Sequence, residues 1–173
     1  MKPKTKNFQA GFTIVELLVS AMVFSIIAIV VSGLFVQILA LERRAFASQK
    51  IQEDGLFIIE LMSREIRVSQ IQNQNSSSCD LTTLTIDHPV NGVVTYSLDN
   101  GVLKRTVSGI ATDLSSSGVS FLRLNFCVLG SGPTDNEQTR VTIIAAIQNK
   151  NGKEKLTANL ETTVSTRDVE TEL

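Results

Sequence analysis

The sequence from Gly11 to Leu41 reads GFTIVELLVSAMVFSIIAIVVSGLFVQILAL, and this stretch has the length of a membrane span. A helix needs about 20 apolar residues to cross the hydrocarbon core of a bilayer, and Glu16 is the only charged residue here. The preceding segment, MKPKTKNFQA, carries three lysines and no acid. Because basic residues next to a span favour the cytoplasmic side, we expect the N-terminus in the cytoplasm and the rest of the chain outside.

The apolar stretch is not typical of a cleaved secretory signal, whose apolar core has about 7 to 15 residues and precedes a small-residue cleavage site. Here the apolar run is longer, and the small pair Ala10-Gly11 stands before it. An uncleaved signal anchor fits the length but does not explain Glu16, because a carboxylate in a membrane segment costs about 2.5 to 3.5 kcal/mol. Either Glu16 lies near the headgroups and stays hydrated, or it has a partner.

The segment GFTIVELLVS resembles the N-terminal signal of type IV prepilins and type II secretion pseudopilins, in which a short basic leader ends in glycine and a glutamate follows. The resemblance implies that prepilin peptidase cleaves between Gly11 and Phe12 and methylates the new amino group of Phe12. It also implies assembly into a filament, where Glu16 pairs with the Phe12 ammonium of a neighbouring subunit and sets the axial register. Such pairing compensates two charges that are costly alone in apolar surroundings.

The same resemblance implies a set of partners. These are prepilin peptidase, other pilin or pseudopilin subunits, an inner-membrane assembly platform, and membrane lipid before assembly. The chain is expected in the cytoplasmic membrane as a single-pass protein with a periplasmic or extracellular C-terminal domain, and then in the filament. Residues 1–11 would be the removed leader and residues 12–41 the transmembrane and filament-core helix.

An amphipathic extension of this helix is expected over residues 42–72, which contain no proline. Apolar residues recur there on one face of a 3.6-residue repeat, namely Ile51, Ile58, Met62 and Ile66. Acids and bases alternate on the remaining positions, as on a solvated helical face.

The apolar helix also lacks the proline that many major pilins place partway along it. No proline stands between Pro3 and Pro89, so Ser32-Gly33 is the weakest point, since glycine inside a helix costs about 1 kcal/mol relative to alanine. This departure favours a minor subunit. The stretches YSLDNGVLKR and GVSFLRLNF resemble J-type minor pseudopilins and PilW-like minor pilins, which implies a place near the filament tip.

Residues 73–173 are expected to form an extracytoplasmic antiparallel β domain. A polar linker at 73–78 precedes segments with a period of two, which predict six strands at 81–87, 92–98, 102–108, 119–129, 140–148 and 155–166. Two hairpin turns are expected at Asp99-Asn100-Gly101 and at 149–152, because Asn-Gly supplies positive φ angles.

The fourth of these strands, which holds Phe121, Leu122, Leu124 and Phe126, is expected to be central. The sheet is expected to bury its apolar face against Ile58, Met62 and Ile66 of the helix. The fold class is therefore α+β, a long N-terminal helix packed on an antiparallel sheet, as in pilin-like proteins.

The two cysteines, Cys79 and Cys127, both lie outside the membrane by this topology, where disulfides persist. A bridge would restrain the unfolded chain by about 4 kcal/mol. The alternative is a buried Cys127 and a free Cys79 on a loop.

Other chemistry has weak support in the sequence. His88 is the only histidine and stands in a turn-like IDHPVNG, and the loop 130–139 holds Asp135, Asn136 and Glu137 without the spacing of a defined calcium loop. Loss of three leader lysines lowers Lys+Arg from 16 to 13 against 17 Asp+Glu, which disfavours nucleic-acid binding. We expect no enzymatic activity, cofactor or metal site.

Two alternatives to a filament subunit remain. An uncleaved single-span receptor or adhesin would bind a ligand with its outer domain and would keep residues 1–11. A secreted enzyme with a retained anchor would require a convergent polar site, which the sequence does not reveal.

Overall fold

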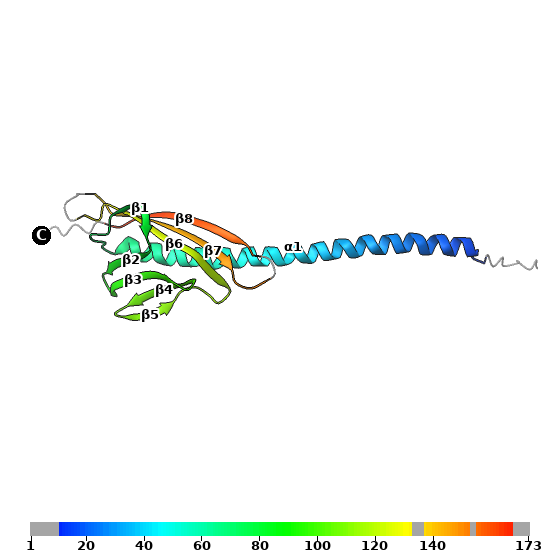
Figure 1. Cartoon of the computed structure of the whole chain (residues 1–173), viewed down its shortest axis with the longest axis horizontal. Helices are drawn as coiled ribbons and strands as arrows, with labels where there is room; N and C mark the ends of the chain where they lie inside the picture. Colours follow the sequence, from blue (N-terminus) through cyan, green and yellow to red (C-terminus); the bar gives the residue numbers. More distant parts are fainter. Residues whose placement is uncertain (1–10, 133–136, 153–154, 168–173) are drawn as a thin grey trace, which may run out of the picture. The chain divides into compact units, whose positions relative to one another are not determined.

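The computed structural model describes residues 11–132, 137–152 and 155–167 (Figure 1). Within these ranges, one helix, α1 (Ile14–Val68), is followed by eight strands in two four-stranded antiparallel sheets. The expected α+β class is therefore confirmed. The chain divides into two compact units, Met1–Glu42 and Arg43–Leu173, and α1 contributes residues to both.

In the first unit, α1 begins at Ile14, and all side chains from 12 to 39 are exposed. The hydroxyl groups of Ser20, Ser25 and Ser32 each donate a hydrogen bond to the carbonyl oxygen four residues earlier, at 2.7, 2.8 and 2.7 Å. These polar groups are therefore satisfied within the helix itself. By length and composition, α1 contains a stretch able to cross a membrane.

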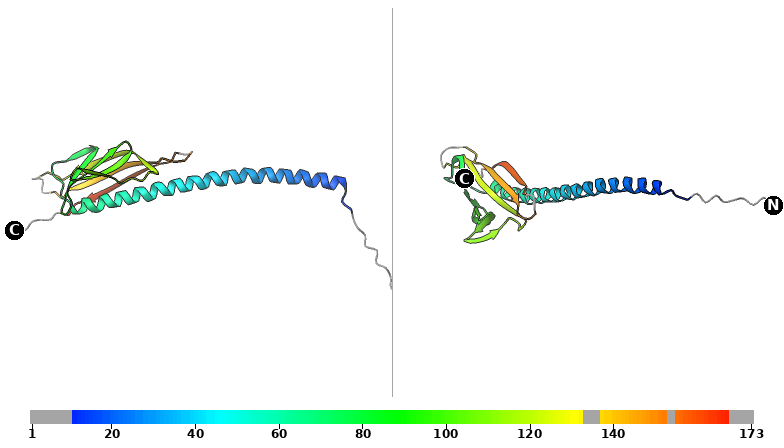
Figure 2. Two further views of the ribbon diagram at one scale, coloured as in Figure 1. Left: turned by 90° about the horizontal axis from the view of Figure 1, so that it is seen from below. Right: turned by 45° about the vertical axis from the view of Figure 1, so that its right-hand side comes forward.

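In the second unit, the C-terminal part of α1 packs on one of the sheets, as the views in Figures 1 and 2 agree. This sheet has the order β1-β6-β7-β8. Its strands are β1 (Ser76–Leu81), β6 (Val119–Leu129), β7 (Arg140–Asn149) and β8 (Thr157–Ser165). The four residues expected on the buried helical face are buried: Ile51, Ile58, Met62 and Ile66.

Gly55 shares that buried face and brings the helix close to the sheet. A Cβ atom at this position would lie 2.6 Å from Leu160 Cδ1 and 3.0 Å from Ile147 Cδ1. Leu160 and Ile147 belong to β8 and β7. The glycine therefore serves close helix–sheet packing.

The second sheet has the order β2-β3-β4-β5. Its strands are β2 (Thr83–His88), β3 (Gly92–Asp99), β4 (Val102–Val107) and β5 (Ile110–Asp113). Both sheets and α1 contribute to one hydrophobic core. The inward side chains include Leu84, Val94 and Leu103 from this sheet and Phe126 and Ile143 from the other.

The period of two in the sequence predicts six strands in one sheet, whereas the described residues form eight strands in two sheets. The additional strands are β1, which includes part of the expected linker 73–78, and β5. Both are edge strands, and all four residues of β5 are exposed. Neither strand shows the alternation of apolar and polar residues from which a strand can be predicted.

The helix ends at Val68 rather than at residue 72. Gln70 forms an isolated bridge with Asp87 of β2, in which the Gln70 N–H donates over 3.0 Å and the Asp87 N–H over 2.8 Å. The chain after Val68 therefore satisfies its backbone groups with a strand instead of with a further helical turn.

The β3–β4 hairpin is present as expected, and the β7–β8 hairpin is present with a longer connection than the expected turn at 149–152, since β7 ends at Asn149 and β8 begins at Thr157. Asn100 and Gly101, between β3 and β4, have φ angles of 48° and 79°, as a two-residue turn of the type I′ class requires. β7 pairs with β8 across the second turn, where Gly152 has a φ of 107°.

β6 is an interior strand, as expected, and Leu122 lies on its exposed face. A register shift between Phe121 and Arg123 marks a bulge, and Leu122 is 54% exposed. The Phe121 N–H donates to the carbonyl oxygen of Gly101 over 2.9 Å. Because the bulge reverses the alternation of faces, Phe121 and Leu124 are both buried while Leu122 is exposed.

Cys79 of β1 and Cys127 of β6 form a disulfide, so the alternative of free cysteines does not hold in the structure. The bridge joins an edge strand to its neighbour, in a pair whose register is irregular. The disulfide therefore fixes β1, which pairs with β6 through the backbone at only a few residues.

A charged network joins α1 to the second sheet. The Arg105 guanidinium donates to both carboxylate oxygens of Glu65, with Nε–Oε2 and Nη2–Oε1 distances of 3.0 and 2.7 Å, and the Tyr96 hydroxyl donates to Oε2. Burial raises the pKa of Glu65, but the hydrogen bonds from Arg105 and Tyr96 outweigh it, so the pKa lies below its usual range. The pKa of Tyr96 is raised by burial and by the Glu65 carboxylate.

Glu65→Gln is expected to lower the free energy of unfolding by about 2 kcal/mol at neutral pH, because it leaves a partly buried guanidinium without its counter-charge. Since the folded pKa of Glu65 is depressed, its stabilisation is present above the unfolded pKa and is lost as the pH falls through the folded pKa. Thermal unfolding of the two proteins from pH 7 to pH 3 measures this. Equal slopes of stability against pH on the acid side would contradict the assignment.

Reduction of the disulfide is expected to lower the free energy of unfolding by about 4 kcal/mol, as loop closure over 48 residues predicts. The paired variant Cys79→Ser with Cys127→Ser should show the same loss without reductant and no further loss when reductant is added. Denaturant titration of both proteins measures it. Unchanged stability on reduction of the wild-type chain would contradict a structural role for the bridge.

Candidate functional site

The residues around the expected cleavage point lie immediately before α1. Gly11, Phe12 and Thr13 are not helical, and the Phe12 side chain is 81% exposed. A Cβ atom built on Gly11 would meet no atom within 4 Å. The described structure therefore gives no steric reason for a glycine at this position. Residues 1–10 of the expected leader lie outside the described residues.

Thr13 is the N-cap of α1. Its carbonyl oxygen accepts the first helical hydrogen bond from the Leu17 N–H at 3.2 Å, and its Oγ1 accepts from the Glu16 N–H at 3.3 Å. A threonine followed three residues later by glutamate is the signature of a capping box. Thr13 is not among the site residues predicted from the sequence, although the letters TIVE contain this signal.

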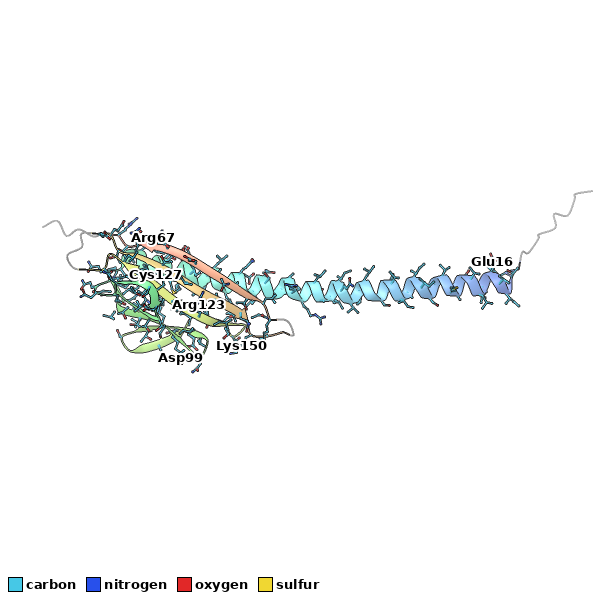
Figure 3. The ribbon with its side chains drawn as sticks, turned by 45° about the horizontal axis from the view of Figure 1, so that its top comes forward. Glu16, Arg67, Asp99, Arg123, Cys127 and Lys150 are labelled. Carbon is cyan, nitrogen blue, oxygen red and sulfur yellow. A yellow bond between two sulfur atoms is a disulfide. The ribbon has the colours of Figure 1, made fainter. Side chains whose placement is uncertain are left out.

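Glu16 therefore lies in the first turn of α1, with its side chain exposed (Figure 3). The unpaired N–H groups of a helix N-terminus carry partial positive charge, which stabilises a nearby carboxylate by about 0.3 to 1 kcal/mol. Among the ion pairs found in the described ranges, none includes Glu16. The carboxylate is thus placed where a cation of another chain can reach it.

Residues 6–32 match the family model of the prokaryotic N-terminal methylation motif. This match includes Gly11, Phe12 and Glu16, and it supports a type IV pilin-like substrate of prepilin peptidase. Together with the long apolar part of α1, the match fits a membrane-anchored protein. No curated protein and no solved structure matches the chain.

The remaining candidates from the sequence lie elsewhere in the structure. His88 ends β2, and its Nδ1 accepts hydrogen bonds from the N–H groups of Val90 and Asn91, at 3.2 Å each. His88 thus stabilises the β2–β3 turn. Of the loop 130–139, residues 133–136, with Asp135 and Asn136, lie outside the described residues. Within the described part of the chain, no three His, Cys, Asp or Glu side chains are placed to hold a metal ion.

Two substitutions separate the charge of Glu16 from its place in the helix cap. Glu16→Gln removes the charge but keeps a residue that suits the third position of a capping box, whereas Thr13→Ala removes the cap and keeps the charge, at about 1 kcal/mol of helix stability. If the charge pairs with a neighbouring ammonium, we expect Glu16→Gln to abolish filament incorporation and Thr13→Ala to leave most of it. Fractionation of sheared filaments from cells measures incorporation.

The level of each variant in the membrane fraction is the control for this comparison. Normal incorporation of Glu16→Gln would contradict a role for the charge. A defect of Thr13→Ala equal to that of Glu16→Gln would assign the role of the segment to helix capping instead.

Proposed function

We propose that this chain is a structural subunit of a type IV pilus-like or type II secretion filament. Prepilin peptidase would cleave between Gly11 and Phe12 and methylate the Phe12 amino group. The observation that carries the proposal is the match of residues 6–32 to the methylation motif, on a segment whose Gly11-Phe12 bond precedes α1 and whose Phe12 side chain is exposed. The role is assembly, and the proposal assigns no catalytic step to the chain.

The geometry of the segment supports this role. The non-helical residues before α1 can enter a protease cleft, and Gly11 offers no side chain to obstruct it. Cleavage would place a new ammonium one helical turn before Glu16, on a helix whose N-terminal apolar side chains are all exposed. An apolar helix of this kind suits both lipid before assembly and neighbouring helices after it.

The uninterrupted helix supports a minor subunit. α1 runs from Ile14 to Val68 without a break at Ser32-Gly33, the weakest point of its apolar part. Major pilins commonly carry a helix-breaking proline in this part, and this chain has none there. We further propose the orientation N-terminus inside and β domain outside, which the leader lysines and the Cys79–Cys127 disulfide both support.

The proposal is tested by the intact mass of the protein after co-expression with a prepilin peptidase. Wild type is expected to lose residues 1–11 and gain one methyl group. Gly11→Leu is expected to keep the leader, because a bulky side chain obstructs the cleft while the described structure has open space at this position. The matched control is Gly33→Leu, since Gly33 also has open space around its Cβ position and lies beyond the cleaved bond.

We expect the Gly33→Leu protein to be processed as wild type is. An unchanged N-terminus in the wild-type protein would favour the uncleaved single-span receptor. Processing of Gly11→Leu at the wild-type rate would contradict recognition of this glycine.

A further inference from the structure

The two sheets differ in how their edge strands are protected. The outer N–H and C=O groups of an edge strand can pair with another chain, and natural proteins usually block them. The edges of the two sheets are β1 and β8, and β2 and β5 (Figure 1). β1 has an irregular register and carries the disulfide, and β5 has only four residues. These two edges are therefore poor templates for a further strand.

The edge of β2 is covered from within the chain. Gln70 pairs with Asp87 through the backbone. The Gln74 side chain acts as a second peptide group would: its Nε2 donates to the Thr85 carbonyl oxygen at 2.5 Å, and its Oε1 accepts from the Thr85 N–H at 3.0 Å. The chain thus occupies groups that β2 would otherwise offer to a partner.

β8 has none of these protections. It is nine residues long and pairs with β7 at every residue without a register shift. Its sequence, TANLETTVS, contains neither proline nor lysine, two residues that commonly block edges. Among the described residues, only β7 forms backbone hydrogen bonds with residues 157–165. β8 is therefore an open edge.

The β7–β8 ladder shows which residues of β8 offer their backbone groups. In an antiparallel ladder, hydrogen-bonded pairs alternate with pairs that are not hydrogen-bonded. The Thr166 N–H donates to the Thr139 carbonyl oxygen at 3.0 Å after the end of β8, and the Asn149 N–H donates to that of Leu156 at 3.2 Å before its start. Both bonds place the even-numbered residues against β7.

The odd-numbered residues of β8 therefore direct their N–H and C=O groups to the free edge, over about 27 Å of strand. They are Thr157, Asn159, Glu161, Thr163 and Ser165.

An added strand would also meet side chains of α1. At the start of β8, a hollow of about 230 Å³ lies between the strand and the helix. Helical spacing places Leu56 on the same side of α1 as Gln52, which lines the hollow, and Leu56 is 63% exposed. When a peptide joins a sheet, such pockets for alternate side chains give specificity. The hollow is lined by Arg44, Ser48, Ile51, Gln52, Leu156, Thr157 and Ala158.

Glu161 determines the charge of a complementary strand. It is the only charged residue of β8, and it is exposed. Among the ion pairs found in the described ranges, none includes Glu161. Opposite charges at directly paired positions stabilise an antiparallel pair, whereas like charges destabilise it. A strand with lysine or arginine opposite Glu161 therefore fits best.

A second copy of this chain fits this edge poorly. β8 runs in the same direction as α1, because Leu160 lies beside Gly55 and the Arg167 N–H, just after β8, donates to the Arg67 carbonyl oxygen at 2.9 Å. An antiparallel pair of β8 strands would point the C-terminal parts of two α1 helices in opposite directions, which does not suit two chains anchored in one membrane. In the centred register, it would also place Glu161 opposite Glu161.

We propose that the free edge of β8 binds an extended segment of another protein, which adds a strand to the sheet. The segment alternates apolar residues, which face α1, with polar residues, and it carries lysine or arginine opposite Glu161. Its backbone pairs with the odd-numbered residues of β8. This inference goes beyond the filament role, because it gives the subunit a binding site for a chain of another kind and does not require cleavage after Gly11.

A synthetic peptide tests the site on the full chain in detergent micelles. The peptide matches the nine-residue length of β8 and alternates threonine with valine, with lysine at its centre. Wild type is expected to bind the labelled peptide, as measured by fluorescence anisotropy. Asn159→Pro is expected to weaken binding at least tenfold, because proline removes an outward N–H and leaves the bonds to β7 in place.

The matched control is Asn159→Thr, which keeps the N–H and is expected to bind as wild type does. No binding by wild type, or equal binding by wild type and Asn159→Pro, would overturn the proposal.

Glu161→Lys gives a second comparison that leaves the backbone unchanged. It is expected to weaken binding of the lysine peptide several-fold and to strengthen binding of the same peptide with glutamate at its centre. An unchanged preference between the two peptides would overturn the pairing opposite Glu161.

Amide hydrogen exchange of the same samples locates the added strand. The peptide is expected to slow exchange at Asn159, Glu161 and Thr163, whose N–H groups point outward, more than at Leu160 and Thr162, which already bond to β7. Slowed exchange confined to residues outside β8 would overturn the site. Sedimentation of the chain alone tests the other occupant: a wild-type dimer that Asn159→Pro abolishes would assign the edge to a second copy and overturn the proposal.

Discussion

The contact of α1 with the inner face of β7 and β8 is the interaction on which the rest of the β unit depends. Ile51, Ile58 and Met62 are at most 2% exposed there, and full burial of such a side chain contributes about 1.5 to 3 kcal/mol. Because Gly55 has no side chain, the helix lies so close to β8 that a Cβ atom at this position would be 2.6 Å from Leu160 Cδ1. A helix of this length in water is stabilised chiefly by such packing of one face rather than by propensity.

The second sheet joins this arrangement through polar contacts as well as through the shared core. Glu65 on α1 holds Arg105 and Tyr96, which stand opposite each other on β4 and β3. Gln70, just after the helix, pairs with β2, and the Gly101 carbonyl of the β3–β4 turn accepts from Phe121 in β6. This hydrogen bond, next to the bulge in β6, thus ties the two sheets together. One helix therefore packs with both sheets, although no strand of one sheet pairs with a strand of the other in the described part of the chain.

The parts of this fold that could be predicted from sequence are those where a periodic pattern is long and one-sided. The buried helical face and the interior strand β6 are of this kind, and the Asn100-Gly101 turn follows from the φ angles that only a few residues adopt. β1 and β5 escaped prediction because edge strands have little or no buried face and so carry no alternation. The exposure of Leu122 between the buried residues Phe121 and Leu124 has no local signal, because the bulge shifts the face of the residues that follow it. The nearby hydrogen bond from Phe121 to Gly101 is a long-range contact that no local pattern encodes.

The candidate site was predictable for a different reason: its recognition is local in sequence. Gly11, Phe12 and Glu16 lie within two helical turns, so a linear motif contains all of them, and the structure adds the cap formed by Thr13. Exposure is not local in the same way. Sequence alone allows Phe46 and Phe57 to be core residues, and only the placed sheets show that the core is filled from the opposite helical face, by Ile51, Ile58 and Met62.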